Sequence, residues 1–553
     1  MKRKKEEYLK IIPLGGLGEI GKNMTLLEFG NDIVIIDCGL AFPDEDMPGI
    51  DVLIPDMGYL EENREKLRGL LVTHGHEDHI GAIPYLLKNF SLPVYGTDLT
   101  VALIGHKLQE MHLSKENLHV VKPGDSVSCG VFACEFIKVS HSIPGAVALA
   151  ITTPLGVVLH TGDFKIDLTP LDGAPIDINR LAYYGTKGVL CLLSESTNVE
   201  KPGYTQSEKE IGKTFRHYFD IAESRVVVAS FASNVYRLQQ IADVAIAHGR
   251  VICFAGRSME QIVSAAQELG YMSVPADKIV KIEDLKRYND NKVCIITTGS
   301  QGEHMSGLYR MANDSHKISV GKGDTVIISA SAIPGNEKDV GAVINSLFDR
   351  GAYVVYDRTA DVHVSGHACR EELKLMLHII KPKFFVPVHG EYRHLQMHAQ
   401  LAEEMGISTD RIFPLHIGES VNIAKTTASM GAPVAAGTVM VDGSDSITDI
   451  VINDRKLLAD DGLFAAVITI DKESGRSMAP IEIISRGFIY MKDSEELIRE
   501  ATECIREEAG RFEKEDKSNY SAIKNSIKSK LRVLLKSRTK RVPVIVPIVI
   551  EVE

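Results

Sequence analysis

Three histidines and one aspartate stand on a single six-residue stretch of the sequence: His74, His76, Asp78 and His79. The apolar run 70–72 before them predicts a buried strand, and residues 80–87 after them predict a helix with a proline in its first turn. Imidazole suits zinc, manganese or iron, and a carboxylate extends the set toward harder ions. Without a cation, these groups would repel each other or leave lone pairs without partners. The stretch therefore predicts a metal site rather than a solvated polar loop.

Three more side chains of the same types follow predicted strands: His141, Asp163 and His389. Each comes after a predicted strand, at 134–140, 157–160 and 384–388. Taken alone, an aspartate at a strand end is usually a turn or cap residue, and a lone histidine is usually a hydrogen-bonded polar side chain. Their value as candidate ligands therefore depends on their order relative to the first stretch.

The first 40 residues predict strands at 11–14, 24–29 and 33–37, where apolar side chains run together. Between the first two, residues 16–21 match the Gly-x-Gly-x-x-Gly dinucleotide fingerprint, which requires a helix directly after it. A β-rich run follows instead, so we expect a glycine-rich hairpin turn rather than a cofactor site.

Strands and helices alternate from residue 209 to residue 362, which indicates a parallel sheet in a separate α/β domain. Histidines of interest resume only after this segment of roughly 150 residues, which is far too long for a simple connection. The layout predicts one domain inserted within another.

The tail is a separate unit. Residues 429–450 are predicted to be a linker, and 451–553 a small ββααβ domain with strands near 463–471, 481–490 and 542–552. The second helix and its end carry eight basic side chains: Lys524, Lys528, Lys530, Arg532, Lys536, Arg538, Lys540 and Arg541. These could contact RNA or form an ordinary solvated helix face.

The bulk properties leave the class of partner open. A chain of 553 residues is too long for one core, and a net charge of −12 argues only weakly against a polyanion, because a local basic groove is sufficient for such a partner. The eight cysteines form no Cys-x-x-Cys pair, which is typical of reduced thiols in a cytoplasmic protein. Neither a signal peptide nor a membrane span is expected.

The order of motifs along the chain is distinctive. It runs His-x-His-x-Asp-His, His141, Thr-Gly-Asp163, Ser-Glu195-Ser-Thr, an α/β insertion, Ser-Gly-His367-Ala and Pro-Val-His389-Gly-Glu. This order resembles the β-CASP branch of the metallo-β-lactamase superfamily, whose members act on nucleic acids. The run 13–23 and the tail resemble bacterial ribonuclease J in particular, and the resemblance covers essentially the whole chain.

The resemblance implies an α/β fold class: a metallo-β-lactamase αββα sandwich with an inserted β-CASP parallel α/β domain and a small α+β C-terminal domain. The expected limits are 1–208 and 363–428 for the two parts of the sandwich and 209–362 for the insertion. A linker at 429–450 and the C-terminal domain at 451–553 complete the chain.

The resemblance also implies two divalent ions, zinc or manganese. One would be bound by His74, His76 and His141, the other by Asp78, His79 and His389, with Asp163 bridging. The implied catalytic side chains are Asp78 at the metal site, His367 as general acid and Glu195 as its partner. A purely phosphate-binding role for His367 stays open, because a helix begins just after it.

Further implied residues surround this centre. The substrate-binding set is Ser233, Ser331, His363, Val364, Ser365, Gly366, His367 and Ala368. A third cation, such as a structural calcium, could be held by Gly49, Asp51 and Asp442, although a solvated loop is the simpler interpretation of those three.

The resemblance implies a ribonuclease that degrades RNA processively from a 5′-monophosphate end, with endonuclease activity, in RNA maturation and decay in the cytoplasm. A homodimer or tetramer is expected, with a paralogous subunit or other RNA-decay proteins as further partners. The alternatives are a β-CASP nuclease acting on DNA or on RNA 3′-processing sites, and an inactive RNA-binding scaffold. A small-molecule hydrolase of this fold would not need the insertion.

Overall fold

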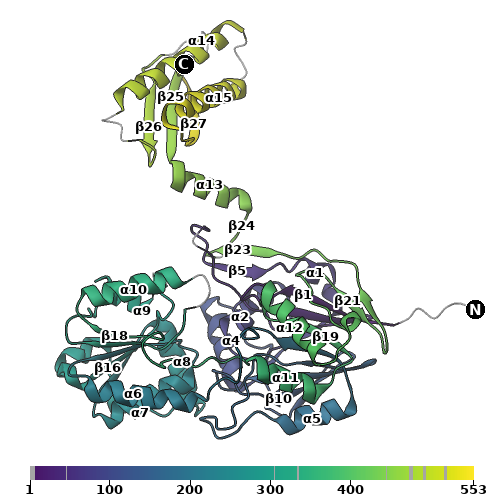
Figure 1. The fold of residues 1–553 in the computed structure, drawn as a ribbon. Helices are drawn as coiled ribbons and strands as arrows, with labels where there is room; N and C mark the ends of the chain where they lie inside the picture. Colours follow the sequence, from purple (N-terminus) through teal and green to yellow (C-terminus); the bar gives the residue numbers. More distant parts are fainter. Residues whose placement is uncertain are drawn as a thin grey trace, which may run out of the picture. The chain divides into compact units, whose positions relative to one another are not determined.

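The computed structural model describes residues 7–44, 46–303, 306–332, 336–443, 445–471, 478–489, 494–515 and 520–552. The chain divides into two compact units. The first comprises Met1–Ala41 with Ile54–Thr438, and the second comprises Phe42–Leu53 with Val439–Glu553. Strands and helices are both abundant in each unit (Figure 1). The mixed α/β class is therefore confirmed.

Two sheets form the centre of the first unit. The larger has the order β22-β21-β1-β3-β4-β6-β7-β8. Its strands are Ala428–Met430, Val421–Ile423, Leu9–Gly15, Met24–Phe29, Asp32–Ile36, Leu67–Leu71, Val94–Gly96 and Leu118–Val120. The smaller has the order β19-β13-β12-β11-β10-β9. Its strands are Phe384–Val388, Val189–Glu195, Gly156–His160, Val147–Thr153, Phe132–Lys138 and Ser126–Cys129.

The two sheets pack face to face, and helices cover their outer faces. One buried cluster joins Leu27 and Val34 of the larger sheet to Phe136 and Leu193 of the smaller one. A second cluster packs α5 (Ile178–Lys187), α11 (Arg370–Ile380) and α12 (Tyr392–Glu404) against the other face of the smaller sheet. On the larger sheet, α4 (Asp98–Glu110) contacts β7 and β8, after the shorter helices α1 (Gly58–Glu62) and α3 (Ile83–Asn89). These layers confirm the expected αββα sandwich.

A parallel sheet with the order β15-β16-β14-β17-β18 lies within the first unit. Its strands in chain order are Val226–Ala229, Val251–Ala255, Val293–Thr297, Thr325–Ile328 and Tyr353–Val355, and every neighbouring pair is parallel. Helices α6 (Ile211–Ile221) and α7 (Val235–Ala247) lie on one side of it, with α9 (Gly307–Ala312) and α10 (Glu337–Asp349) on the other (Figure 1). Helix α8 (Arg257–Glu268) follows β15. The predicted α/β insertion is thus present.

The chain returns from the insertion directly into the sandwich. Strand β19 pairs in parallel with β13, and this register places Val388 opposite Glu195. The last residues of β13 and the residue after β19 are therefore neighbours, although the insertion separates them in sequence. The glycine-rich run near the N-terminus forms the short β2 (Leu17–Gly18), which pairs with β20 (Gly390–Glu391), and the next element is β3. The run therefore lacks the helix that the dinucleotide fingerprint requires directly after it.

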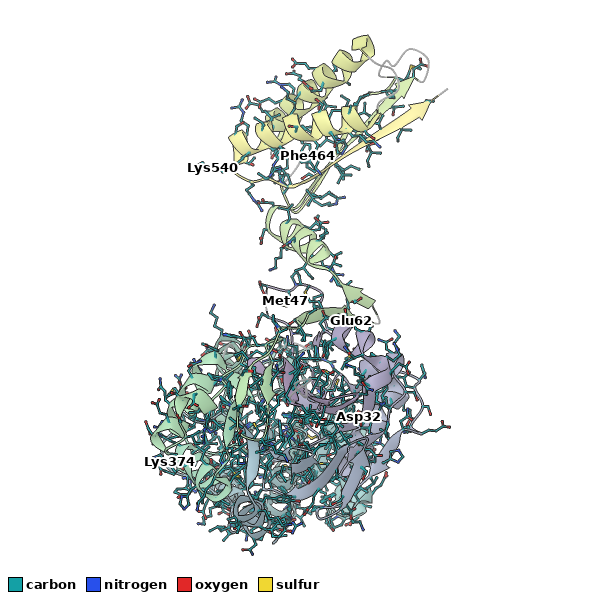
Figure 2. All side chains as sticks on the ribbon, turned by 90° about the vertical axis from the view of Figure 1, so that its right-hand side faces the viewer. Asp32, Met47, Glu62, Lys374, Phe464 and Lys540 are labelled. Atoms are coloured by element: carbon teal, nitrogen blue, oxygen red, sulfur yellow. The ribbon has the colours of Figure 1, made fainter. Side chains whose placement is uncertain are left out.

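The second unit contains a three-stranded sheet with the order β26-β25-β27. It is built from β25 (Leu463–Asp471), β26 (Glu482–Arg486), α14 (Glu495–Glu515), α15 (Tyr520–Thr539) and β27 (Val544–Val552), the ββααβ order expected from the sequence. One apolar cluster joins both helices to the sheet, with Phe464 fully buried in it (Figure 2).

The stretch predicted to be a linker is more regular than expected. It contains β23 (Thr438–Asp442), β24 (Asp445–Ile447) and the start of α13 (Asp449–Asp461). Apolar side chains of α13, including Ile450, Val451 and Leu458, are exposed. The apolar residues of this helix therefore do not mark a single buried face. In the described part of the chain, no helix combines the length and apolarity that crossing a bilayer requires.

Candidate metal centre

The candidate ligands all follow strands whose ends lie at one edge of the sandwich. His74 comes after β6, His141 after β10, Asp163 after β12 and His389 after β19. Asp78 and His79 lie on the single turn of helix α2 (Glu77–Ile80). These candidate ligands form two groups of side chains, and within each group the ligand atoms lie within 4.8 Å of one another. Asp163 also forms a third such group with Glu195 and His367.

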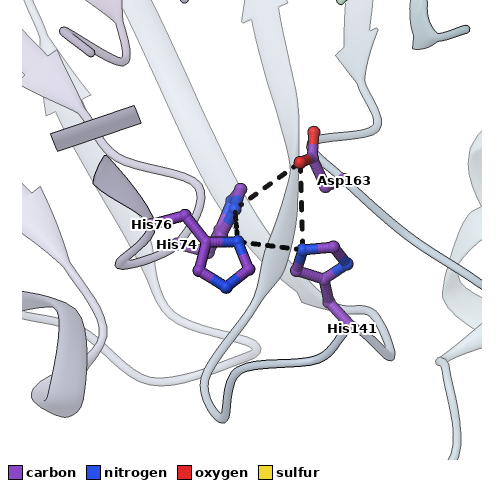
Figure 3. Close-up of side chains that lie close together, drawn as sticks. All are labelled: His74, His76, His141 and Asp163. Atoms are coloured by element: carbon purple, nitrogen blue, oxygen red, sulfur yellow. Dashed lines mark hydrogen bonds and ion pairs between the residues drawn. The ribbon is translucent and has the colours of Figure 1, made fainter. Parts of the chain in front are cut away.

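The first group contains His74, His76, His141 and Asp163 (Figure 3). His76 Nδ1 lies 3.0 Å from His74 Nε2 and 3.1 Å from His141 Nε2. Asp163 Oδ2 lies 3.6 Å from His74 Nε2 and 3.8 Å from His141 Nε2. Ligand bonds of about 2.0–2.1 Å to a tetrahedral zinc ion place ligand atoms about 3.4 Å apart. These distances scatter around that value, so the group fits such an ion.

The second group contains Asp78, His79, Asp163 and His389. Asp163 Oδ2 lies 3.3 Å from His79 Nε2 and 3.4 Å from His389 Nε2. Asp78 Oδ2 lies 3.5 Å from His79 Nε2 and 3.8 Å from His389 Nε2. The same oxygen of Asp163 therefore belongs to both groups, as a bridging ligand requires.

Hydrogen bonds behind the histidines fix which ring nitrogen faces the centre. Nδ1 of His141 donates to the Gly366 carbonyl at 2.8 Å, and Nδ1 of His79 donates to the Asp37 carboxylate at 2.8 Å. Nδ1 of His389 donates to Asn23 Oδ1 at 2.9 Å. Because carbonyl and carboxylate oxygens only accept, the opposite nitrogen of each ring, in its neutral form, keeps a lone pair that points into the centre. This donor set suits two divalent metal ions.

Burial sets the charge of the first group. It lowers the pKa of His76 to about 4, and it lowers those of His74 and His141 well below the ordinary value. For His79 burial also disfavours the charged form, but Asp163, Asp78 and Asp37 outweigh it and raise its pKa well above the ordinary value. The first three rings are therefore neutral at neutral pH, which is the form that binds a metal.

Two supporting residues, Asp37 and Asn23, were missed by the sequence analysis. Asp37 directly follows β4 and adopts a left-handed backbone with φ of 58°, and it also accepts hydrogen bonds from the backbone and hydroxyl of Thr73. Asn23 holds His389 and donates to the Asp78 carbonyl at 3.1 Å. A Cβ atom on Gly16 would lie 2.2 Å from Asn23 Oδ1, so the glycine-rich turn makes room for Asn23. For Asp37 the available signal was a polar residue directly after a buried strand, whereas Asn23 precedes β3 and offered no such signal.

Asp37→Asn should weaken metal binding at the second group by about 10- to 100-fold, because asparagine tolerates the backbone but holds the His79 ring less strongly. Titration of the metal-free protein with manganese, followed by cleavage activity, measures the change. Asp32→Asn is the matched control, since Asp32 stands at the other end of β4 and pairs with Arg68. Equal manganese requirements in the two variants would contradict the supporting role.

His367 and Glu195 form a pair beside the two groups. His367 Nδ1 lies 2.8 Å from Glu195 Oε2, and Glu195 Oε1 accepts from the backbone of Phe164 at 2.9 Å. Burial disfavours the charged ring, but Glu195 and Asp163 outweigh it and raise the pKa of His367 to about 9. Bound cations would oppose that increase. The pair can hold a proton next to the centre.

The loop 363–368 turns its carbonyl groups into the protein. The Val364 carbonyl accepts from Arg237 at 3.1 Å, and the Ser365 carbonyl accepts from Lys165 at 3.3 Å. The next two carbonyls, of Gly366 and His367, accept from His141 at 2.8 Å and Thr205 at 2.6 Å. These bonds fix the loop, and the bond from His141 places Gly366 against a candidate metal ligand. His367 Nδ1 lies 3.7 Å from Asp163 Oδ2.

Ser233 and Ser331 follow β14 and β17, which are adjacent parallel strands. Both side chains are partly exposed, and the Ser331 carbonyl accepts from Gln301 at 2.8 Å. Their role in binding substrate stays a prediction.

An arginine side chain, Arg455, occupies part of the predicted third cation site. Arg455 donates to the Gly49 carbonyl at 2.8 Å and pairs with Asp442 at 2.6 Å, while Asp51 accepts from the Gly443 backbone at 2.7 Å. The three predicted groups do lie close together. A guanidinium already supplies a positive charge between two of them.

Comparisons with protein-family models cover most of the chain. A model described as "Metallo-beta-lactamase superfamily" matches residues 17–187, and "Ribonuclease J, beta-CASP domain" matches 223–347. "Zn-dependent metallo-hydrolase RNA specificity domain" matches 353–411, and "Ribonuclease J C-terminal domain" matches 450–552.

Curated relatives match along the full chain. Ribonuclease J2 of Bacillus subtilis (strain 168) is 40% identical over 100% of both chains. Ribonuclease J 1 of Streptococcus pyogenes is 41% identical over 99% of this chain and 98% of that protein. Ribonuclease J of Helicobacter pylori (strain B128) is 45% identical over 89% of this chain and 72% of that protein.

A solved structure of a protein of unknown function from Enterococcus faecalis V583 aligns with a TM-score of 0.51 at 15% identity. It covers 75% of this chain and 100% of that one. At this identity the likeness concerns the fold alone.

Proposed function

Because this chain belongs to the ribonuclease J family, it is a metal-dependent ribonuclease, and we propose that it degrades RNA from 5′-monophosphate ends in the 5′→3′ direction and also cuts internally. The observation that carries the catalytic part is the Asp163 oxygen shared by two groups of histidine lone pairs. We propose the seven side chains His74, His76, Asp78, His79, His141, Asp163 and His389 as ligands of two ions.

Two divalent ions, when bound, would supply an activated water and neutralise charge on the phosphate. The remaining chemistry belongs to the chain. Glu195 accepts from His367 Nδ1 and so leaves Nε2 free to give a proton to the departing 3′ oxygen. Hydrolysis in this direction leaves a 5′-phosphate and a 3′-hydroxyl. No side-chain nucleophile is required.

The ligand chemistry suits more than one kind of ion. Five histidines favour zinc, and the two carboxylates also suit manganese, so we propose that either ion supports activity. A structural calcium at Gly49, Asp51 and Asp442 is the weaker proposal, because Arg455 already pairs with Asp442 at 2.6 Å. The comparison with a zinc-dependent metallo-hydrolase domain supports zinc.

We propose that loop 363–368, together with Ser233 and Ser331, binds phosphates of the RNA. The inward carbonyls of the loop support this, because their partial negative charges are directed away from a phosphate bound at the outer side of the loop. The limits 209–362 for the inserted domain and 451–553 for the C-terminal domain are part of the same proposal.

The 5′-end preference can be tested with 3′-labelled RNA that carries a 5′-monophosphate, 5′-triphosphate or 5′-hydroxyl. We expect metal-dependent release of mononucleotides, fastest from the monophosphate and abolished by chelator. Internal fragments that are indifferent to the 5′ end would contradict the end pocket. Cleavage of single-stranded DNA at the same rate would contradict selectivity for RNA.

We propose that the protein acts as a homodimer or tetramer in the cytoplasm, alone or with a paralogous subunit or other RNA-decay proteins. All eight cysteines are free, which suits a reducing compartment. The second unit exposes alternate apolar side chains on its edge strand β27, with Val546, Ile548, Ile550 and Val552 each 38–46% exposed. An edge strand with exposed apolar side chains is a typical site of contact between subunits.

Ile548→Lys should lower the molar mass of the full chain in solution, because a charge on the apolar face opposes its burial in a subunit contact. Light scattering after size exclusion measures the mass. Val533→Lys is the matched control, since Val533 is 67% exposed on α15 instead. A monomeric wild-type chain would contradict the proposal.

A further inference from the structure

Arg237, on α7 of the inserted parallel domain, is the largest fully buried side chain among the described residues, with an exposed fraction of 0%. A guanidinium in such a place is costly unless its charge and its N–H groups are paired. Glu208 provides the opposite charge, with Oε1 2.7 Å from Nε and Oε2 3.1 Å from Nη2. The pair lies outside the metal groups, and neither residue was singled out by the sequence analysis.

The other N–H groups of Arg237 join two further segments. Nη1 donates to the Ser329 carbonyl, directly after β17, at 2.8 Å. Nη2 donates to the Val364 carbonyl at 3.1 Å, and Nη1 also donates to His363 Nδ1 at 2.9 Å. One side chain therefore connects the carboxyl edge of the inserted sheet to the first residues of the loop 363–368.

The contact with His363 fixes the protonation pattern of that ring. A guanidinium can only donate, so Nδ1 of His363 must be the acceptor. In a neutral imidazole the other nitrogen, Nε2, then carries the proton. A second proton on Nδ1 would face the guanidinium directly. Burial, and then the charge of Arg237, lower the pKa of His363 well below its ordinary value, in agreement with this geometry.

We propose that Arg237 is a positioning residue that holds His363 as the neutral tautomer protonated on Nε2, so that this N–H donates to a phosphate oxygen of bound RNA. The inference rests on the proposed function and extends it to the residue that prepares the loop. Because Glu208 offsets the charge of Arg237, positive charge near the phosphate would come instead from Lys165, whose ammonium group lies 3.3 Å from the Ser365 carbonyl. The neutral His363 ring would thus donate a hydrogen bond to the phosphate without adding a positive charge.

The tautomer can be observed directly by nitrogen-15 NMR of the full chain labelled in its histidines. The two nitrogens of a neutral ring have well-separated shifts, and His363→Gln identifies the resonances that belong to His363. We expect a protonated Nε2 and an unprotonated Nδ1 in the wild type, with a change in this pattern in Arg237→Lys. An Nδ1-protonated or doubly protonated His363 would overturn the proposal.

Arg237→Lys keeps the charge beside Glu208 but cannot donate to all of the same acceptors. We expect KM for RNA to rise about tenfold with kcat changed less than about threefold, the loss of roughly one well-placed hydrogen bond. His363→Gln, which retains a donor, should raise KM less than His363→Ala does. Arg180→Lys is the matched control, because Arg180 pairs with Glu135 through two contacts of 2.6 Å away from the site.

Binding of a short RNA in chelator, followed by fluorescence anisotropy, should weaken in Arg237→Lys by the same factor as KM rises. An unchanged KM in a folded Arg237→Lys variant would overturn the inference, and so would a fall in kcat alone. If the wild type cleaves no RNA, the proposed function fails whatever the tautomer. If it cleaves RNA while His363 carries its proton on Nδ1, only this inference fails.

Discussion

Asp163→Asn is expected to lower kcat for RNA cleavage by about a thousandfold or more, while RNA binding changes little. The side chain is buried, with 2% of its surface exposed, and its Oδ2 belongs to both groups of candidate ligands. Asparagine preserves the shape but removes the negative charge that both ions would share. Loss of several kcal/mol of transition-state stabilisation corresponds to a change of this size.

Three measurements on Asp163→Asn separate a lost catalyst from a lost fold. Cleavage rates give kcat, fluorescence anisotropy gives RNA affinity, and elemental analysis gives bound metal. Asp172→Asn is the control, because Asp172 pairs with Lys138 at 2.6 Å away from the metal groups. An Asp163→Asn variant that keeps wild-type kcat would contradict the two-ion account, and a wild type that binds but does not cleave RNA would favour the inactive scaffold.

His367→Ala should lower kcat by about 100- to 10,000-fold, the usual contribution of a general acid. The 2.8 Å contact of its Nδ1 with Glu195 orients the ring, and its other nitrogen would protonate the departing 3′ oxygen. An RNA with sulfur in place of that oxygen tests the role directly, because a thiolate leaves without a proton. On this substrate the rates of wild type and His367→Ala should converge.

Glu195→Gln should show the same pattern with a smaller loss, because the amide still contacts the ring without its charge. Metal content should stay at the wild-type level in both variants. If His367 only binds phosphate, sulfur substitution will leave the gap between wild type and His367→Ala as large as before. That result would remove the general-acid assignment and leave the rest of the site unchanged.

The sequence sufficed for residues whose chemistry is local. Three histidines and an aspartate on one turn have few other uses, and each remaining candidate ligand lies one to three residues after the end of a strand. Parallel pairing of β12, β13 and β19 then brings residues from distant parts of the chain to the same sheet edge. Spacing alone did not identify His141, Asp163 and His389 as ligands. The order of the motifs and the family resemblance did.

Residues that act through a second residue could not be predicted in the same way. Asn23, Asp37 and Arg237 each look ordinary in sequence, and their roles depend on contacts made across the fold. Helix α13 was missed for a different reason, since its exposed apolar residues do not follow the period of a buried face. Local pattern predicted the ligands, and only tertiary structure revealed what orients them.

Anomalous X-ray scattering from crystals of the full chain grown with manganese would test the central claim most directly. The account predicts two peaks per chain, one within bonding distance of His74, His76 and His141 and the other of Asp78, His79 and His389, with Asp163 contacting both. A single peak, or two peaks that do not share Asp163, would contradict it.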